Sequence, residues 1–355
     1  MASQPASASS RRSVITVEHL SKRFGAQVSV NDVSFEVYEG EIFGFIGPSG
    51  SGKTTTMRLI TGIYEPSGGR VRMLGQNPHH SASTLHERYG YMPQLFVLYP
   101  SLSVMENMNF VASIYGMPWW KRKAQVREAL DFVELWEHRG KLAGNISGGM
   151  QRRLELAATL VHRPTVIFVD EPTAGIDPIL RVKFWEEFRK LRDAGRTLFV
   201  TTQYIGESEY CDRVGVINKG RLIAIGTPVE LRRRALGGSE AVDLTVDSRH
   251  TCPMLEQILK PLPTYRGIED LAHGTIRVYV ADAGEATPDI AAALLAAGVE
   301  VKSLSEYKPN FDEVFFQLME QDAADHPDET QDSDGVTLER LERRSDRQAA
   351  NQGRT

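Results

Sequence analysis

Short apolar runs and segments of helical spacing alternate along most of the chain. Apolar and polar positions alternate at residues 14–20 and again at 28–37, which predicts two strands. Residues 42–46 form an apolar run that ends at a glycine, as a buried strand does. Residues 53–63 then have helical character. A buried strand, a Gly-rich loop and a helix therefore follow one another near the N-terminus.

The alternation of strands and helices continues to residue 225. The pattern predicts further strands at 69–74, 89–93, 165–169 and 197–201, and helices at 104–115, 121–136 and 179–192. Ser103 and Glu106 form a capping box at the start of the first of these helices. Residues 214–217 and 222–225 flank an Asn-Lys-Gly turn, which predicts a hairpin. Strands that alternate with helices favour a mainly parallel α/β core.

A smaller region follows a boundary at residues 237–239. Its pattern predicts strands at 242–246, 275–280 and 299–304 and helices at 286–297 and 311–319, which together make a small α+β domain. The last residues are polar and charged and contain no aromatic side chain, so disorder is expected there. We therefore divide the chain into a disordered leader (1–13), a core domain (14–236), an accessory domain (240–320) and a disordered acidic tail (321–355).

Composition and charge narrow the functional classes. The 355 residues carry a formal net charge of −5, which argues against a protein that binds nucleic acid by neutralising phosphates. Residues 321–355 hold nine acidic and five basic residues, so most of the excess charge belongs to the tail. The two cysteines are too few for a disulfide framework and suit a reducing compartment.

No apolar run approaches the 18 residues that a membrane span needs, and the N-terminal residues lack the apolar stretch of a secretory signal. We therefore expect a chain that is not integral to a membrane.

The strongest motif lies between the buried strand and the following helix. It comprises Gly47, Pro48, Ser49, Gly50, Ser51, Gly52, Lys53, Thr54 and Thr55 and matches the phosphate-binding pattern G-x-x-x-x-G-K-[ST]. Glycines let backbone N–H groups converge on phosphate oxygens, and the helix adds its positive end. Lys53 then reaches the β- and γ-phosphates, and the Thr54 hydroxyl ligates Mg²⁺. The motif predicts a nucleoside triphosphate site.

A second motif is the apolar strand at 165–169, which ends in two carboxylates. Asp170 lies where P-loop enzymes place the acid that contacts Mg²⁺, and Glu171 lies where a general base for the attacking water belongs. Acidic residues at a strand end are common. This pair is informative because it follows a P-loop.

A third motif consists of Ser147, Gly148, Gly149 and Met150 at the start of a predicted helix. Taken together, the three motifs resemble those of ABC-type ATPases over residues 14–236. The resemblance implies an α/β P-loop NTPase core with a helical subdomain at about 95–150, followed by the small α+β C-terminal domain. It also implies that Ser147, Gly148, Gly149 and Met150 act on the ATP of a partner subunit, as a homodimer or a heterodimer.

The resemblance assigns roles to four further positions. Gln94 matches the glutamine that touches Mg²⁺ and links the helical subdomain to the core. Phe24 matches the aromatic residue that stacks on adenine, although an ordinary core aromatic is the alternative. Asp177 matches an aspartate that crosses the dimer interface. Gln203 stands where the family usually has a histidine near the γ-phosphate, and an amide donates a hydrogen bond but cannot become cationic.

The implied function is the ATP-binding and hydrolysing subunit of an ABC transporter, with ATP and Mg²⁺ bound. Separate membrane permease subunits would dock near Leu95–Tyr99, which would hold the chain on the cytoplasmic face of the cell membrane. The Gly-Ile-Asp-Pro sequence after the acidic pair and the C-terminal domain resemble ATPases of the ABC-2 exporter type. The alternatives are a non-transport ABC ATPase and a regulatory ATP-binding module with weak hydrolysis. No nucleic-acid partner is expected.

One further segment has two interpretations. Trp119 and Trp120 precede three basic residues, a composition found at membrane interfaces. The interpretation that we favour from the sequence is that the tryptophans pack at a helix start and the basic residues are solvated.

Overall fold

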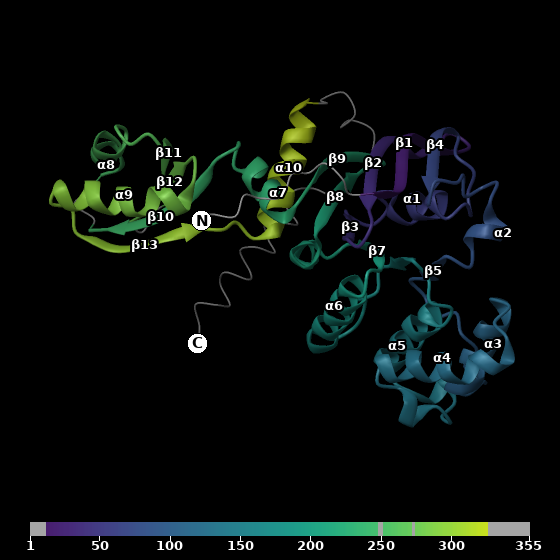
Figure 1. The fold of residues 1–355 in the computed structure, drawn as a ribbon. Helices are drawn as coiled ribbons and strands as arrows, with labels where there is room; N and C mark the ends of the chain where they lie inside the picture. The colour runs from purple at the N-terminus through teal and green to yellow at the C-terminus, as the bar shows by residue number, and fades with distance from the viewer. Residues whose placement is uncertain (1–11, 248–250, 272–273, 326–355) are drawn as a thin grey trace. The chain divides into compact units, whose positions relative to one another are not determined.

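The computed structural model describes residues 12–247, 251–271 and 274–325 (Figure 1). Most of the predicted leader and the predicted tail from residue 326 lie outside the described residues. The described part of the leader already enters the first strand at Ser13, and the last helix ends at Asp325. The tail predicted from residue 321 therefore begins inside a helix, a correction to that boundary.

The strands are β1 (Ser13–Phe24), β2 (Gln27–Tyr38), β3 (Ile42–Ile46), β4 (Gly68–Met73), β5 (Tyr89–Met92), β6 (Val166–Asp170), β7 (Thr197–Thr202), β8 (Arg213–Asn218), β9 (Arg221–Gly226), β10 (Glu240–Val246), β11 (Tyr265–Asp270), β12 (Thr275–Val280) and β13 (Val301–Tyr307). The α-helices are α1 (Lys53–Ile60), α2 (Ala82–Leu85), α3 (Val104–Ile114), α4 (Trp119–Phe132), α5 (Gly148–Leu160), α6 (Pro178–Asp193), α7 (Pro228–Ala235), α8 (Cys252–Leu259), α9 (Ala283–Ala296) and α10 (Phe311–Asp325). Short 3-10 helices are η1 (Trp136–His138), η2 (Ala143–Asn145) and η3 (Ile205–Tyr210).

A six-stranded sheet forms the centre of the core domain. Its strand order is β5-β6-β7-β3-β8-β9, and every pair except the hairpin β8–β9 is parallel. A three-stranded antiparallel sheet of order β2-β1-β4 packs on this core, and α3, α4 and α5 pack together as a helical group (Figure 1). The mainly parallel α/β core predicted from the sequence is therefore confirmed. Parallel neighbouring strands require crossover connections, and this requirement explains why strands and helices alternate along the chain.

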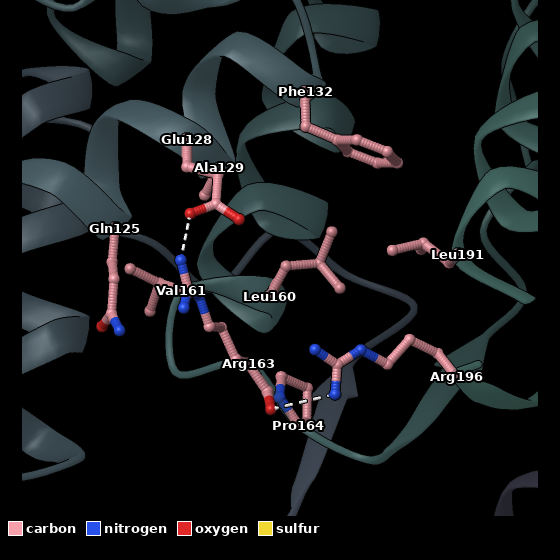
Figure 2. A pocket seen from close by; sticks show the side chains of 10 residues that line it. All are labelled: Gln125, Glu128, Ala129, Phe132, Leu160, Val161, Arg163, Pro164, Leu191 and Arg196. Carbon is pink, nitrogen blue, oxygen red and sulfur yellow. Dashed lines mark hydrogen bonds and ion pairs between the residues drawn. The ribbon is translucent and has the colours of Figure 1, made fainter. Parts of the chain in front are cut away.

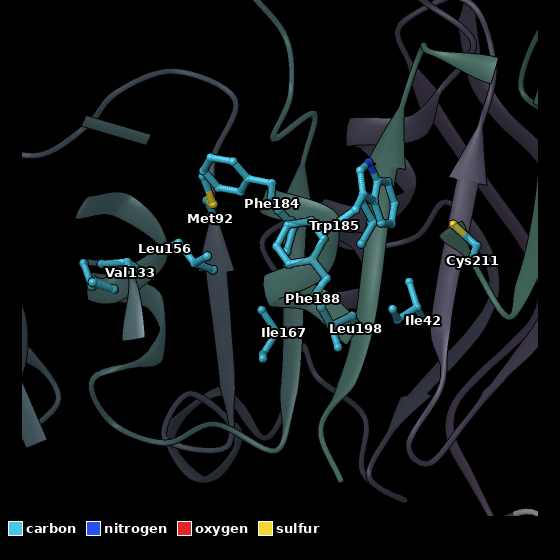
Figure 3. Packing of buried hydrophobic residues seen from close by; sticks show 14 of the residues in the cluster. Ile42, Met92, Val133, Leu156, Ile167, Phe184, Trp185, Phe188, Leu198 and Cys211 are labelled. Atoms are coloured by element: carbon cyan, nitrogen blue, oxygen red, sulfur yellow. The ribbon is translucent and has the colours of Figure 1, made fainter. Parts of the chain in front are cut away.

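Both faces of the central sheet are buried, which explains the uninterrupted apolar run of β3. Ile42 and Ile46 point into a cluster with the apolar side of α6, where Phe184, Trp185 and Phe188 lie (Figure 3). Phe43 and Phe45 belong to the opposite cluster, in which aromatic rings of β2, β3, β6 and β7 pack between the two sheets. A strand buried on both sides has no polar positions to alternate with.

Parallel pairing brings the functional motifs to one edge of the sheet. Ile46 pairs with Thr202, and Asp170 pairs with Thr201, so β3, β6 and β7 end at the same level. The carboxyl ends of parallel strands are the usual place for a ligand site in such sheets. The P-loop, the acidic pair and Gln203 all follow these three ends.

The C-terminal region contains a four-stranded antiparallel sheet of order β11-β12-β10-β13. Helices α8 and α9 bury Leu255, Leu259, Ile290 and Leu294 in one cluster with the inward positions of β10 and β12. The alternating strands predicted at 242–246 and 275–280 correspond to β10 and β12, which form the centre of this sheet.

Helix α10 packs differently from the sequence expectation, which placed residues 311–319 in the accessory domain. Its Phe311, Val314 and Leu318 belong to the core cluster that contains Ile46 and Leu231, not to the cluster of the C-terminal sheet. Helical spacing shows that a helix has an apolar face, but it does not show which neighbour covers that face.

Candidate nucleotide-binding site

The loop from Gly47 to Gly52 has a shape that only glycine permits at its two ends. A Cβ atom on Gly47 would lie 2.1 Å from the Ile217 carbonyl oxygen. Gly52 precedes α1 with a φ of 103°, and a Cβ there would lie 2.5 Å from the Ser29 carbonyl oxygen. The missing side chains leave the backbone N–H groups at the start of α1 open to an anion.

Other groups of the loop also fit a phosphate. The Ser51 hydroxyl is buried and has no hydrogen-bond partner among the described residues. Buried hydroxyls are normally hydrogen-bonded, so an unpartnered one suits a ligand oxygen. Pro48, Ser49 and Gly50 are exposed at the tip, and the Thr55 hydroxyl accepts a hydrogen bond of 3.0 Å from Ser29. The cradle therefore fits phosphate oxygens.

Lys53 is buried under this loop. Its Nζ donates to the carbonyl oxygens of Gly47 at 2.8 Å and Pro48 at 3.0 Å, and it lies 3.3 Å from Oε1 of Glu171. Burial lowers the pKa of Lys53, while the charge of Glu171 acts in the opposite direction. The ammonium is thus held where the loop and the acidic pair meet.

Asp170 ends β6 and collects hydroxyl groups from three elements. The Thr54 hydroxyl donates to its Oδ1 at 3.2 Å, the Thr201 hydroxyl donates to the same oxygen, and the Tyr91 hydroxyl donates to Oδ2 at 3.5 Å. Hydroxyl, carboxylate and amide oxygens are the ligands that Mg²⁺ prefers. The Thr54 hydroxyl and the Asp170 carboxylate lie together and suit a magnesium ion, whereas the Gln94 amide contacts Glu171.

Glu171 has a backbone conformation that is unusual for a residue with a side chain. Its φ is 46°, and its N–H donates to the Thr201 carbonyl oxygen at 3.0 Å and to the Thr201 hydroxyl at 3.1 Å. Gln94 Nε2 donates to Oε2 at 3.3 Å, opposite Lys53 at Oε1. Strained backbone of this kind persists where surrounding contacts fix it, often at functional sites.

Two predicted residues lie at the margins of the site. Gln203 follows β7 directly and is exposed, beside the end of β3 by strand register. Phe24 ends β1 with 45% of its surface exposed, and its ring meets Tyr64 edge-to-face at 5.4 Å. The interpretation of Phe24 as an ordinary core aromatic is therefore wrong, and its ring is accessible for stacking.

The Ser-Gly-Gly motif caps a helix and remains open to solvent. The Ser147 hydroxyl accepts a hydrogen bond of 3.3 Å from the N–H of Met150, while Ser147 and Gly148 are exposed. Asp177 is likewise exposed and caps α6 by accepting from the Leu180 N–H at 2.9 Å. Within the described ranges, no hydrogen bond or ion pair joins Ser147 or Asp177 to the P-loop of the same chain.

Sequence reasoning missed Arg152, which connects three parts of the site. This buried guanidinium donates to the carbonyl oxygens of Pro93 at 2.8 Å, Glu171 at 3.0 Å and Pro172 at 3.2 Å. It therefore joins the helix of the Ser-Gly-Gly motif to the strand that precedes Gln94 and to the backbone of the acidic pair. The available signal was a charged residue at an inward position of α5.

Glu155 completes this network from the next turn of α5. Its Oε2 accepts from Arg152 at 2.7 Å, and its Oε1 accepts from the Val97 N–H at 3.1 Å. Burial raises the pKa of Glu155, and Arg152 opposes that rise. The 95–99 segment is thereby connected through Glu155 and Arg152 to the backbone of Glu171.

A pocket of about 110 Å³ lies elsewhere, between α4, the end of α5 and the end of α6 (Figure 2). Its lining comprises Gln125, Glu128, Ala129, Phe132, Leu160, Val161, Arg163, Pro164, Leu191 and Arg196. None of the predicted site residues is among them. This pocket is therefore separate from the candidate site at the edge of the sheet.

Comparison with known proteins agrees with this geometry. A family model described as ABC transporter matches residues 30–174. The "Linearmycin resistance ATP-binding protein LnrL" of Bacillus subtilis (strain 168) is 31% identical over 310 residues, covering 86% of this chain and 98% of that protein. The "Nod factor export ATP-binding protein I" of Burkholderia lata is 39% identical over 224 residues, covering 63% of this chain and 74% of that protein.

Two further similarities differ in coverage. The "Probable multidrug ABC transporter ATP-binding protein YbhF" of Escherichia coli (strain K12) is 36% identical over 234 residues, or 66% of this chain, but this chain spans only 40% of that protein. The solved structure of cbiO1 from Clostridium perfringens, part of the ABC transporter complex cbiONQ, has a TM-score of 0.59 and 25% identity, covering 71% of this chain and 96% of that chain.

The chain belongs to the family of ABC transporter ATP-binding proteins, and its core domain has the P-loop ATPase fold of that family.

Proposed function

We propose that this chain binds and hydrolyses ATP to drive a separate membrane permease that exports its substrate. The observation that carries the proposal is the convergence of Lys53, Asp170 and Glu171 at one edge of the sheet, with Lys53 touching both the P-loop and Glu171. A phosphate cradle, a cation and a carboxylate within hydrogen-bond reach are the components that P-loop ATPases need.

The reaction follows from these placements. Backbone N–H groups of the loop and Lys53 hold the phosphates and offset the charge that develops on them. Glu171 lies where its carboxylate accepts a proton from the attacking water. Thr54, Asp170 and Gln94 would hold Mg²⁺, which when bound neutralises charge on the phosphate oxygens. Lys53 at Oε1 and Gln94 at Oε2 hold the Glu171 carboxylate that would accept this proton.

Gln203 supplies the remaining contact with the terminal phosphate. Its amide donates a hydrogen bond to a phosphate oxygen but carries no charge. If positioning is its main role, Gln203→His holds or raises the steady-state ATPase rate. A large loss of activity in that variant would show that the amide itself is required, and would direct attention to the alternative of a regulatory module.

The exposed Ser-Gly-Gly motif supports a head-to-tail dimer. Ser147 and Gly148 are exposed at the start of α5, and Gly149 and Met150 are half-buried beside them, so we propose that this helix N-terminus takes the nucleotide of a second subunit. Asp177, the N-cap residue of α6, is also exposed. Each ATP then lies between two subunits, so ATP binding closes the dimer and hydrolysis opens it.

The segment Leu95–Tyr99 supports docking of a permease. Leu95 and Val97 are 76% and 62% exposed, whereas Phe96 and Leu98 pack inward and fix the segment. Hydrogen bonds connect this segment to the backbone of Glu171 through Glu155 and Arg152. Docking therefore has a physical connection to the hydrolytic site, and it holds the chain at the cytoplasmic face of the membrane. In the described ranges no helix has the length and apolar composition of a membrane span.

Export rather than import is inferred from the relatives. Their names refer to multidrug transport, linearmycin resistance and Nod factor export. Substrate selection would belong to the permease, whose walls contact the cargo.

The test is co-expression with a candidate permease identified by pull-down from membranes, followed by purification from detergent-solubilised membranes. We expect the two chains to co-purify and the permease to stimulate ATP hydrolysis. Leu95→Glu together with Val97→Glu removes the apolar docking contact and should abolish co-purification while basal ATPase activity persists. Wild-type protein that never associates with the permease would contradict the transport function, and stimulation by RNA or DNA would favour the non-transport alternative.

A further inference from the structure

The first residues of α4 expose two tryptophans to solvent. Trp119 and Trp120 are 77% and 65% exposed, and their rings meet edge-to-face, with centroids 5.9 Å apart. The expectation that they pack at a helix start is therefore wrong. Exposing a large aromatic side chain to water is unfavourable in free energy, and proteins normally avoid it by burying the ring against other residues. Two neighbouring exposed tryptophans therefore indicate a surface that binds a partner.

The residues around the pair carry a concentrated positive charge. Lys121 and Lys123 are exposed, whereas Arg122 is fixed by donating to the Met117 carbonyl oxygen and to the Ser113 hydroxyl, each at 2.7 Å. The stretch 107–127 contains four basic residues and no acidic residue, in a chain whose net charge is −5. This part of the chain therefore attracts anions, although the whole molecule does not.

The position of these charges in the helix is locally unfavourable. The N-terminal end of a helix carries a partial positive charge and favours acidic side chains. In α4 the first turn has no acidic residue, and Pro118 provides no side-chain cap. Exposed aromatic rings and basic residues at this helix end both reduce the stability of the isolated chain. Residues that are unfavourable for stability, with no contact that compensates for them, often mark a functional surface.

We propose that Trp119, Trp120, Lys121 and Lys123 bind the anionic surface of a lipid bilayer directly. A bilayer interface supplies both missing partners at once. Tryptophan rings settle at the level of the headgroups, and lysine ammonium groups meet the headgroup phosphates. Two hydrogen bonds fix Arg122, and the two rings and the two lysines all belong to the first five residues of α4, so they lie together at one end of this helix.

This contact is separate from permease docking through Leu95–Tyr99. The proposed function brings the chain to a membrane through a protein partner, whereas this surface binds lipid without any partner. The test is therefore made with the purified full-length chain alone, and its failure would leave the transport proposal intact.

The measurement is co-sedimentation with vesicles in about 0.1 M salt. We expect binding to phosphatidylcholine vesicles that contain about 30% phosphatidylglycerol, and little binding to pure phosphatidylcholine. Trp119→Ala with Trp120→Ala should abolish this binding. Lys121→Gln and Lys123→Gln should each weaken it about fivefold, the effect of about 1 kcal/mol per basic residue near an anionic surface. Raising the salt to about 0.5 M should weaken the wild type in the same direction.

A matched control variant has Leu95→Ala and Val97→Ala. These side chains are as exposed and apolar as the tryptophans, but they belong to the docking segment. The control should bind vesicles like the wild type and lose association with the permease. Trp119→Ala with Trp120→Ala should retain the thermal midpoint and the basal ATPase rate, because neither ring is buried in the core or placed in the nucleotide site.

Fluorescence gives a second, independent measurement. Lipids with bromine in their acyl chains quench only tryptophans that enter the interface. We expect quenching in the wild type and its loss in the double tryptophan variant. Of the two tryptophans that remain, Trp185 is fully buried, and Trp136 is half-buried with the guanidinium groups of Arg127 and Arg139 over its ring. Absence of binding to anionic vesicles would overturn the proposal, as would equal binding by the double tryptophan variant. Dependence of the binding on added permease would instead assign the surface to a protein contact and would also overturn it.

Discussion

At the scale of single residues, two adjacent carboxylates occupy different environments. Asp170 accepts hydrogen bonds from hydroxyl groups of Thr54, Thr201 and Tyr91, which suits a metal contact. Glu171 lies between a cation and an amide, on a strained backbone. One step along the chain therefore separates the residue that would hold Mg²⁺ from the residue that would activate water.

Replacing Glu171 with glutamine tests this division. Glu171→Gln keeps the shape and removes the base, so steady-state ATP hydrolysis should fall by about 10²–10⁴ while ATP binding is retained. The variant should accumulate as an ATP-bound dimer, which size-exclusion chromatography would detect. Glu137→Gln, at a highly exposed glutamate, is the control and should behave like the wild type. Near-normal hydrolysis by Glu171→Gln would exclude this residue as the base.

A second residue-scale prediction concerns Glu187 on α6. Its Oε2 has no hydrogen-bond partner among the described residues, and burial raises the pKa of Glu187 to about 7. Nearby Arg153, Lys190 and Lys183 act against this rise without cancelling it, whereas Glu134 adds to it. Because the folded pKa exceeds the unfolded value, this group stabilises the fold fully below the unfolded pKa of about 4.5 and loses that contribution as the pH rises through about 7.

The variant Glu187→Gln should remove this pH dependence. Relative to the variant, the wild type should lose up to about 3 kcal/mol of unfolding free energy between pH 4.5 and pH 8. Chemical denaturation of both proteins across this range is the measurement. Parallel curves for the two proteins would show that Glu187 ionises normally in the fold.

At the scale of elements, α5 does more than present the Ser-Gly-Gly motif. Its inward face carries Arg152 and Glu155, a buried ion pair that contacts the backbone on both sides of the site. Removing one partner of a buried pair leaves an uncompensated charge, whereas an apolar replacement of both is often tolerated. Mutation can therefore separate the contribution of this pair to stability from its role in connecting the 95–99 segment to the backbone of Glu171.

Arg152→Met alone should destabilise the protein by about 3–5 kcal/mol, because Glu155 is left buried without its partner. Arg152→Met combined with Glu155→Leu should recover most of the thermal midpoint. Stimulation of ATP hydrolysis by the permease should remain impaired in the double variant, since Val97 and the Glu171 backbone are no longer joined. Restored stimulation in a stable double variant would show that the pair serves folding only.

The elements differ in how well the pattern predicted them. Strand β3 and helix α3 were predicted because an apolar run and a capping box are local signals, and the capping box of Ser103 and Glu106 is present. Helix α8 and strand β11 were missed because they are short, with eight and six residues. Helix α10 was predicted, but its packing partner was misassigned, since the Phe311 face lies against the core.

At the scale of the whole molecule, the net negative charge lies outside the part that does the chemistry. Residues 321–355 contain nine acidic and five basic residues, whereas Lys53, Asp170 and Glu171 belong to a core domain (14–236) that contains 23 acidic and 28 basic residues. The structure shows that residues up to Asp325 complete α10. A deletion that tests the role of the charged region should therefore begin after Asp325.

Deleting residues 326–355 should leave the ATPase rate and the thermal midpoint of the core unchanged. The physical reason is that the contacts described for Lys53, Asp170 and Glu171 all come from residues before 326. The rate of the truncated protein, measured with and without permease, checks the prediction. A change in either rate would give the charged region a regulatory role.

The sequence by itself determined the chemistry that depends on neighbours along the chain. Gly47 to Thr55 and the pair Asp170 and Glu171 are each continuous, so their backbone fixes the relative placement of their groups and a pattern suffices to find them. The tertiary structure alone decided which distant groups meet. Strand register brings Thr201 to Asp170, and helix packing brings Arg152 to the backbone of Glu171. Exposure to solvent is decided in the same way. Trp119 and Trp120 are exposed because no other described element packs against them, and the sequence of α4 alone does not contain this information.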